Sequence, residues 1–227
     1  MTTSDNRLPE LSANLRSVQE RVRAAALSAG RSEDEITLVV VTKTFPVEDI
    51  QALYSLGVRN FGENRDQEGS VKAPQLPSDS IWHFQGQIQS NKLKSISTWA
   101  DVIHSLDDRK HAQKLSELGT NARVLIQVAL EDKLREDRGG VDPDLLSEFL
   151  EEVIGRMKLN VVGVMAVAPL GVEALPAFQQ LTSIFQEVRK KWPQLSAISA
   201  GMSGDFEAAI SAGATHIRVG SSILGSR

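Results

Sequence analysis

The sequence of 227 residues contains no cysteine, which excludes disulfide bonds, thiolate metal sites and thiol nucleophiles and fits a reducing compartment. No apolar run approaches the ~20 residues that a helix needs to cross a bilayer. The first ten residues also lack the charged-then-apolar layout of a secretory signal. With a net charge of −4, the chain has no protein-wide attraction to nucleic acid. We therefore expect a cytoplasmic protein with neither a membrane nor a nucleic acid as partner.

The rest of the composition, 41% hydrophobic and 24% charged, is typical of a globular protein. Apolar residues from Leu8 to Val22 recur at helical spacing and predict a helix that ends near Gly30. Strand-like and helix-like segments then alternate at steps of roughly twenty residues. The predicted strands begin near Ile36, Val58, Ile81, Val102, Val124, Leu159, Leu195 and Thr215.

Eight strands alternating with helices predict a single (β/α)8 TIM-type barrel over residues 1–227, with an additional N-terminal helix. A doubly wound open sheet is the structural alternative, because periodicity alone does not distinguish the two. No Gly-x-Gly-x-x-Gly turn follows the first strand, which counts against a dinucleotide-binding version of that sheet. The charged segment 131–142 predicts a mobile loop after the fifth strand, although a solvated charge run is the plainer interpretation.

Functional groups of such barrels gather where strands end and helices begin. Lys43 directly follows the first predicted strand, so its side chain is expected to point toward the central mouth. A neutral amine there can attack an aldehyde and form an imine. Burial or a nearby cation must first lower the pKa of the amine from its ordinary value near ~10.4. A solvent-facing lysine at a strand end is the plainer interpretation.

Two turns rich in glycine and serine, at 199–210 and 217–225, follow the last two strands. Ser203 is predicted to cap a helix whose first amides would form an anion site, and a cap without a ligand is the alternative. Gly220 and Ser221 open a final short helix in the same way. Turns of this kind after strands seven and eight form the usual phosphate pocket of the barrel.

Arg218 lies between the two turns and could pair with a phosphate, point into the mouth beside Lys43, or serve as an ordinary ion-pair partner. The histidines show no metal-ligand spacing and are not predicted to cluster. They are His83, His104, His111 and His216. His83 could line the mouth, but a hydrogen-bonded structural role is favoured.

At these residues the sequence resembles the pyridoxal phosphate homeostasis proteins (the YggS/PROSC-type family). The resemblance covers nearly the whole chain, with its motifs in the family's order. The motifs are VTKTFP at 41–46, FGENRDQE at 61–68, WHFQGQIQSNK at 82–92, IHSLD at 103–107, VGVMAVAP at 162–169, GMSGDFEAAI at 201–210 and RVGSSILG at 218–225. Gln87 and the pair Ala168–Pro169 depart from the residues usual at the rim of the family's site.

The resemblance implies a lone barrel related to the N-terminal domain of alanine racemases. It further implies that Lys43 carries pyridoxal 5′-phosphate as an imine and that Arg218 faces the pyridine nitrogen. Ser203 and the amides of Gly220 and Ser221 would hold the phosphate. Residues expected to line the pocket as well are Asn64, His83 and Met165.

Arginine can only donate hydrogen bonds, so a ring nitrogen facing Arg218 is expected to remain unprotonated and to be a weak electron sink. The one tyrosine, Tyr54, is predicted on the first barrel helix, away from the mouth, so an opposed base is lacking. We therefore expect a monomeric binding module that stores, buffers or delivers this small-molecule cofactor, with transient contact to apo enzymes that use it. A racemase using the cofactor, and an aldolase using Lys43 directly on a sugar phosphate, are the alternatives.

Overall fold

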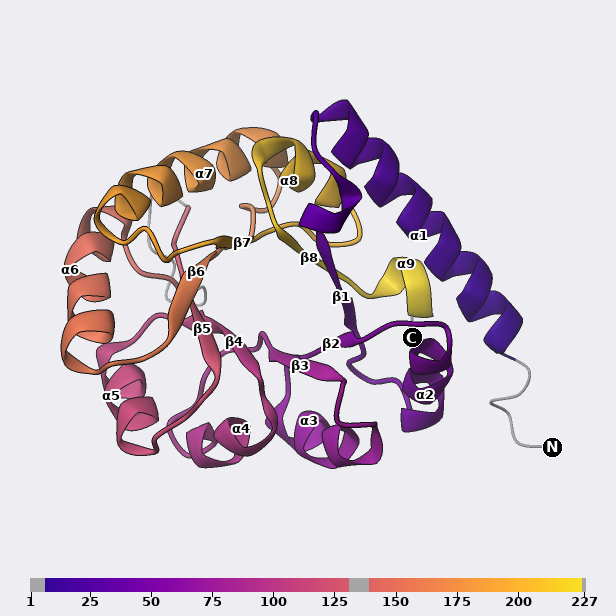
Figure 1. Ribbon diagram of the computed structural model, residues 1–227, viewed down its shortest axis with the longest axis horizontal. Coiled ribbons are helices and arrows are strands. Elements are labelled where there is room, and N and C mark those ends of the chain that lie inside the picture. Colours follow the sequence, from indigo (N-terminus) through magenta and orange to yellow (C-terminus); the bar gives the residue numbers. More distant parts are fainter. Residues whose placement is uncertain (1–6, 131–138, 226–227) are drawn as a thin grey trace.

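A computed structural model describes residues 7–130 and 139–225. Its strands are all parallel and close into a barrel, in which each strand pairs with the next and the last pairs with the first (Figure 1). The strands are β1 (Thr37–Val41), β2 (Asn60–Glu63), β3 (Ile81–Phe84), β4 (Val102–Leu106), β5 (Arg123–Gln127), β6 (Val161–Met165), β7 (Ala197–Ser199) and β8 (His216–Val219). Every predicted strand start lies within two residues of the observed one. Closure of the barrel excludes the open sheet.

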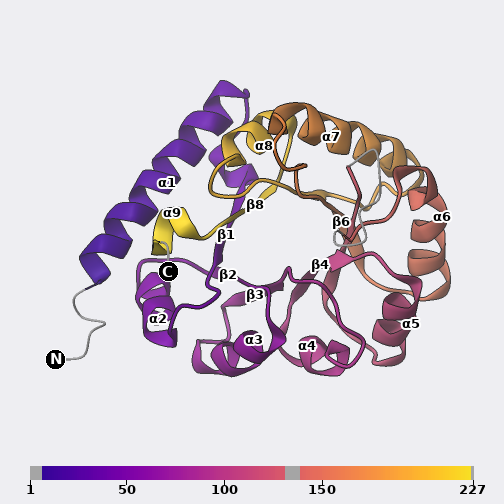
Figure 2. The same ribbon diagram turned by 180° about the vertical axis from the view of Figure 1, so that it is seen from behind.

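Helices surround the barrel on its outside, as both views show (Figures 1 and 2). They are α1 (Leu8–Ser28), α2 (Val47–Ser55), α3 (Asp66–Lys72), α4 (Leu93–Trp99), α5 (Arg109–Glu117), α6 (Leu146–Leu150), α7 (Ala174–Lys191), α8 (Phe206–Ala212) and α9 (Ser221–Leu224). Short 3-10 turns occupy Glu33–Glu35, Ala73–Gln75 and Pro143–Leu145, and α6 continues into a π-helical turn at Glu151–Arg156. None of the helices in the described ranges is long and apolar enough to span a membrane.

The additional N-terminal helix is confirmed as α1, which packs across α2, α8 and α9 outside the barrel. Its apolar residues recur every three or four positions and so share one face of the helix, which is buried against these neighbours. The buried members of this face are Leu11, Leu15, Val18, Val22 and Ala26.

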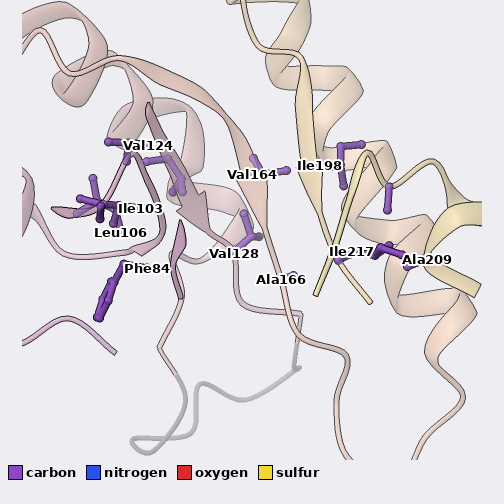
Figure 3. Close-up of a cluster of buried hydrophobic side chains, with 14 of the residues drawn as sticks. Phe84, Ile103, Leu106, Val124, Val128, Val164, Ala166, Ile198, Ala209 and Ile217 are labelled. Atoms are coloured by element: carbon purple, nitrogen blue, oxygen red, sulfur yellow. The ribbon is translucent and has the colours of Figure 1, made fainter. Parts of the chain in front are cut away.

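The main apolar core lies between the strands and the helices that cover them (Figure 3). Alternate residues of a strand point to opposite faces, so Phe84, Ile103, Ile198 and Ile217 face this outer layer. Their neighbours along the same strands point into the barrel, and several of them are polar. The interior of the barrel therefore combines apolar layers with buried polar side chains, which are His83, His104, Ser199 and Arg218.

The predicted loop at 131–142 is only partly described. Residues 131–138 lie outside the described ranges. Residues 139–142 return to the end of β5, where the Gln127 amide donates to the Gly139 carbonyl at 2.7 Å and Val141 bridges Val128. This last part of the segment is thus attached to the barrel.

Candidate functional site

A cavity of about 370 Å³ opens at the carboxyl ends of the strands. It is lined by Val41, Lys43, Asn64, Gln85, Met165, Val167, Met202, Ser203, Gly204, Arg218, Gly220 and Ser221. Seven of the eight residues predicted for the site meet here, from both ends of the chain. They meet because closure places the first and last strands side by side. The eighth, His83, does not line the cavity.

Lys43 follows β1 and reaches the cavity with an exposed side chain. Burial of this side chain, one of the two expected causes of a neutral amine, is not observed. Arg218 lines the same cavity. The Lys43 amine has no hydrogen bond or ion pair with any residue of the described ranges.

Hydrogen bonds fix the backbone on either side of Lys43. The Thr42 carbonyl accepts a hydrogen bond from the Lys72 amine at 2.9 Å, and the Thr44 amide donates to the Glu68 carboxylate at 2.7 Å. Thr44 has a φ of 68°, a left-handed conformation that costs free energy in a β-branched residue. The surrounding contacts therefore maintain a strained turn that directs Lys43 to the mouth.

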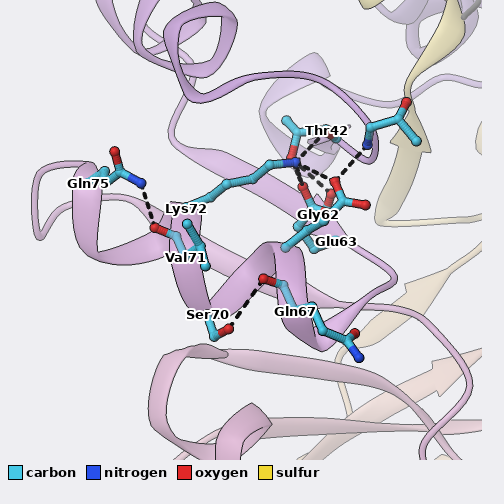
Figure 4. A network of polar contacts seen from close by, with 10 residues as sticks. Thr42, Gly62, Glu63, Gln67, Ser70, Val71, Lys72 and Gln75 are labelled. Carbon is cyan, nitrogen blue, oxygen red and sulfur yellow. Dashed lines mark hydrogen bonds and ion pairs between the residues drawn. The ribbon is translucent and has the colours of Figure 1, made fainter.

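The same contacts belong to a buried ion-pair network, which extends from the end of β1 to α3 (Figure 4). The Lys72 amine lies 2.6 Å from Glu63 and 2.7 Å from Glu68, and the Thr42 hydroxyl donates to Glu63 at 2.6 Å. Burial raises the pKa of Glu63, against the opposing effects of Lys72 and Thr42. Sequence reasoning missed Lys72, although the i, i+4 spacing of Glu68 and Lys72 on one helix is a recognisable ion-pair signal.

The opposite side of the cavity is formed by the two glycine- and serine-rich turns. The Ser203 hydroxyl oxygen accepts hydrogen bonds from the Gly220 amide at 3.2 Å and the Ser222 amide at 3.5 Å. The prediction that Ser203 caps the following helix is wrong, since α8 begins only at Phe206 and Asp205 precedes it. Ser203 instead joins the two turns, which leaves its hydroxyl hydrogen available for a ligand.

These turns approach the end of β1 closely. A Cβ added to Gly220 would lie 3.1 Å from the Val41 carbonyl oxygen, two residues before Lys43. The Ser221 amide donates to none of the residues that the structure describes. The amine, a free amide and a serine hydroxyl therefore border one cavity.

Arg218 supplies a buried positive charge to the cavity, with only 5% of its surface exposed. Its guanidinium donates to the Ser199 hydroxyl at 2.6 Å and to the Ala166 carbonyl at 3.1 Å. Burial lowers the pKa of Arg218 to about 10, with Asp205 acting in the opposite direction. No carboxylate in the described ranges forms an ion pair with it, so the ordinary ion-pair interpretation is not supported.

His83 lies below the cavity, buried in the barrel interior. Its ring contacts Asn60 at 3.0 Å and His104 at 2.8 Å. The prediction that the histidines do not cluster is wrong, because the ring centroids of His83, His104 and His216 lie 5.1–6.3 Å apart. His83 on β3, His104 on β4 and His216 on β8 meet inside the closed barrel, although they are far apart in the sequence.

Comparison with known proteins agrees with this architecture. The family model for the N-terminal domain of alanine racemase matches residues 8–227. The pyridoxal phosphate homeostasis protein of Mycobacterium bovis is 37% identical over 246 residues, covering 98% of this chain and 95% of the relative. The protein of that name from Escherichia coli is 33% identical over 229 residues, covering 96% of this chain and 97% of the relative.

Solved structures show the same fold. PipY of Synechococcus elongatus, solved with PLP bound, is 31% identical with a TM-score of 0.81, over 95% of this chain and all of PipY. The D-threonine aldolase of Filomicrobium marinum shares the fold at 16% identity and a TM-score of 0.72, with 60% of its chain covered. The fold and the site thus define a barrel of the alanine racemase N-terminal class. Within this class, the chain belongs to the pyridoxal phosphate homeostasis protein family.

Proposed function

We propose that this protein binds pyridoxal 5′-phosphate in the cavity at the barrel mouth and serves its homeostasis in the cytoplasm without catalysing a reaction. The observation that carries the proposal is the meeting of the Lys43 amine, the buried Arg218 cation and the joined turns of Ser203 in one cavity. The names of the relatives and the PLP-bound PipY structure support it.

The residues of the cavity fit such a ligand. Its phosphate needs hydrogen-bond donors, which the Ser203 hydroxyl and the Ser221 amide supply. Asn64 and Gln85 each keep a buried side-chain oxygen without a hydrogen-bond partner in the described structure. A donor on a ligand, such as the ring hydroxyl, would satisfy one of them, and unpaired buried oxygens are otherwise costly.

Each functional side chain has a distinct task in this proposal. The Lys43 amine would hold the ligand covalently through its aldehyde carbon, with loss of water. Arg218 remains charged near neutral pH, since its pKa is about 10, and would donate to the ring nitrogen. The bound cofactor supplies electrophilic chemistry, but a ring nitrogen that stays unprotonated withdraws electrons weakly.

An acid–base partner opposite Lys43 is also lacking among the residues that line the cavity. Tyr54 lies on α2, where its hydroxyl donates to Asp79 at 2.5 Å and the Arg59 guanidinium covers its ring at 3.9 Å. Its hydrogen bond to Asp79 raises the pKa of Tyr54, which disfavours a role as a base. These observations support storage, buffering or delivery to apo enzymes, and do not favour racemisation.

The test is borohydride reduction of the protein loaded with the cofactor, followed by peptide mapping. We expect one cofactor-sized adduct on Lys43. Lys43→Ala should lose the adduct and the visible absorbance while keeping its circular dichroism spectrum. Lys110→Ala, a change on the outer surface of α5, is the matched control and should keep both. An adduct on another lysine refutes the site, and α-proton exchange of amino acids into deuterated water refutes the non-catalytic role.

A further inference from the structure

A continuous chain of hydrogen bonds crosses the barrel interior below the cavity. The Arg218 guanidinium contacts Ser199 Oγ at 2.6 Å, and Ser199 Oγ contacts His104 Nδ1 at 2.9 Å. His104 Nε2 contacts His83 Nδ1 at 2.8 Å, and His83 Nε2 contacts Asn60 Oδ1 at 3.0 Å. The two histidines and Ser199 are almost completely buried, so solvent does not replace any of these partners.

The chemistry of its two ends gives this chain a single direction. The Asn60 oxygen only accepts, so a neutral His83 donates to it from Nε2 and accepts at Nδ1. His104 then donates from Nε2 to His83 Nδ1 and accepts at its own Nδ1. The Ser199 hydroxyl therefore donates to His104 Nδ1, while its oxygen accepts from Arg218, which can only donate. Burial lowers the pKa values of both histidines well below 6.5, in keeping with one donor and one acceptor on each ring.

We propose that Ser199, His104 and His83 are positioning residues that hold the charged guanidinium of Arg218 toward the ring of the bound cofactor. This inference rests on the proposed function. Arg218 has no ion-pair partner in the described ranges, so its orientation depends on the neutral acceptors Ser199 and Ala166. A hydroxyl that donates into a further chain is a stronger acceptor, because successive hydrogen bonds polarise one another.

Because the hydrogen-bonded chain is neutral, it leaves the positive charge of Arg218 intact, whereas a carboxylate would not. A carboxylate bonded to Arg218 would cancel its charge and compete with the ligand for its hydrogens. The Ser199–His104–His83 chain orients the guanidinium and leaves the positive charge directed at the cavity. We therefore expect changes far below the cavity to alter the spectrum of the bound cofactor.

The first experiment needs no cofactor: nitrogen-15 NMR of the imidazole rings in the intact protein. We expect His83 and His104 to be neutral and protonated on Nε2. A proton on Nδ1 of either ring, or a charged ring at neutral pH, overturns the proposed direction. This result is independent of whether the protein binds pyridoxal phosphate.

The second experiment compares cofactor affinity and the visible absorbance maximum in the loaded protein. His104→Leu interrupts the chain and should weaken binding about tenfold, as expected for one hydrogen bond to a charged group, and move the maximum. His104→Gln keeps one acceptor and one donor, so it should restore most of the affinity and most of the wild-type absorbance maximum. His216→Asn is the matched control, because the His216 ring lies beside the chain but bonds only to Thr215 among the described residues, and the variant should match wild type.

Wild-type affinity and spectrum in folded His104→Leu overturn the positioning role. If that variant does not fold, Ser199→Ala removes the same link with a smaller change in volume and should show the same two effects. A Ser199→Ala protein that behaves as wild type overturns the proposal. Failure of wild type to bind the cofactor refutes the proposed function, while the NMR result still decides the direction of the chain.

Discussion

Replacement of Lys72 by methionine tests the network that supports Lys43. Methionine keeps most of the length of the side chain but removes an amine that contacts Glu63, Glu68 and the Thr42 carbonyl at 2.6–2.9 Å. Lys72 is 7% exposed and Glu63 is fully buried, so water cannot replace the lost partner. Removal of one member of a buried ion pair typically costs 3–5 kcal/mol, and we expect a loss of about 4 kcal/mol. This is a large share of the roughly 5–15 kcal/mol that stabilises a typical domain.

Urea unfolding at pH 7, followed by circular dichroism, measures this loss. The control is Lys190→Met, which removes an exposed ion pair with Glu187 and should leave the free energy of unfolding nearly unchanged. The double variant Lys72→Met with Glu63→Gln should recover much of the stability, because a neutral amide replaces the unpaired carboxylate. A single variant no less stable than the control, or a double variant no better than the single, would refute the reasoning.

Two further predictions concern the barrel interior. Because burial holds the pKa values of His83 and His104 well below the unfolded value near 6.5, the unfolded state binds more protons as the pH falls. The free energy of unfolding should therefore fall as the pH drops below 6.5, by up to about 1.4 kcal/mol per pH unit for each histidine. Urea titrations of His104→Gln from pH 7 to 5 should show a shallower loss than wild type. Gly163→Ala would place a Cβ 1.8 Å from the Ala197 carbonyl oxygen and should reduce soluble yield and melting temperature sharply, whereas Gly155→Ala, with open space around it, should not.

The strands were predictable because a parallel strand covered on both faces is nearly continuous in apolar residues. The run at 36–42 shows this pattern clearly, and β1 begins at Thr37. The same pattern did not distinguish a barrel from an open sheet, since closure depends on the pairing of β1 with β8 across the whole chain. A contact between segments about 180 residues apart leaves no local trace in either segment.

The polar interior was harder to predict for a similar reason. His83 stands between apolar neighbours on its strand, and His104 and Ser199 each follow an isoleucine, a pattern that indicates inward-facing polar residues. Which of them meet depends on the stagger of the strands around the barrel, and that stagger is not visible in one sequence. Ser203 was predicted to lie at the phosphate turns, but its bonds to the neighbouring turn require the fold.

Two lysines near the same end of the barrel illustrate how the fold separates structural from chemical roles. The Lys72 amine is buried and bonded to three acceptors, so it has neither access to an aldehyde nor a free position for one. The Lys43 amine lines the cavity and has no partner in the described ranges, while the network around Lys72 holds the backbone on both sides of it. A Lys43→Ala protein should therefore form no cofactor adduct on Lys72. An adduct there would show that the network opens readily and does not hold the backbone beside residue 43.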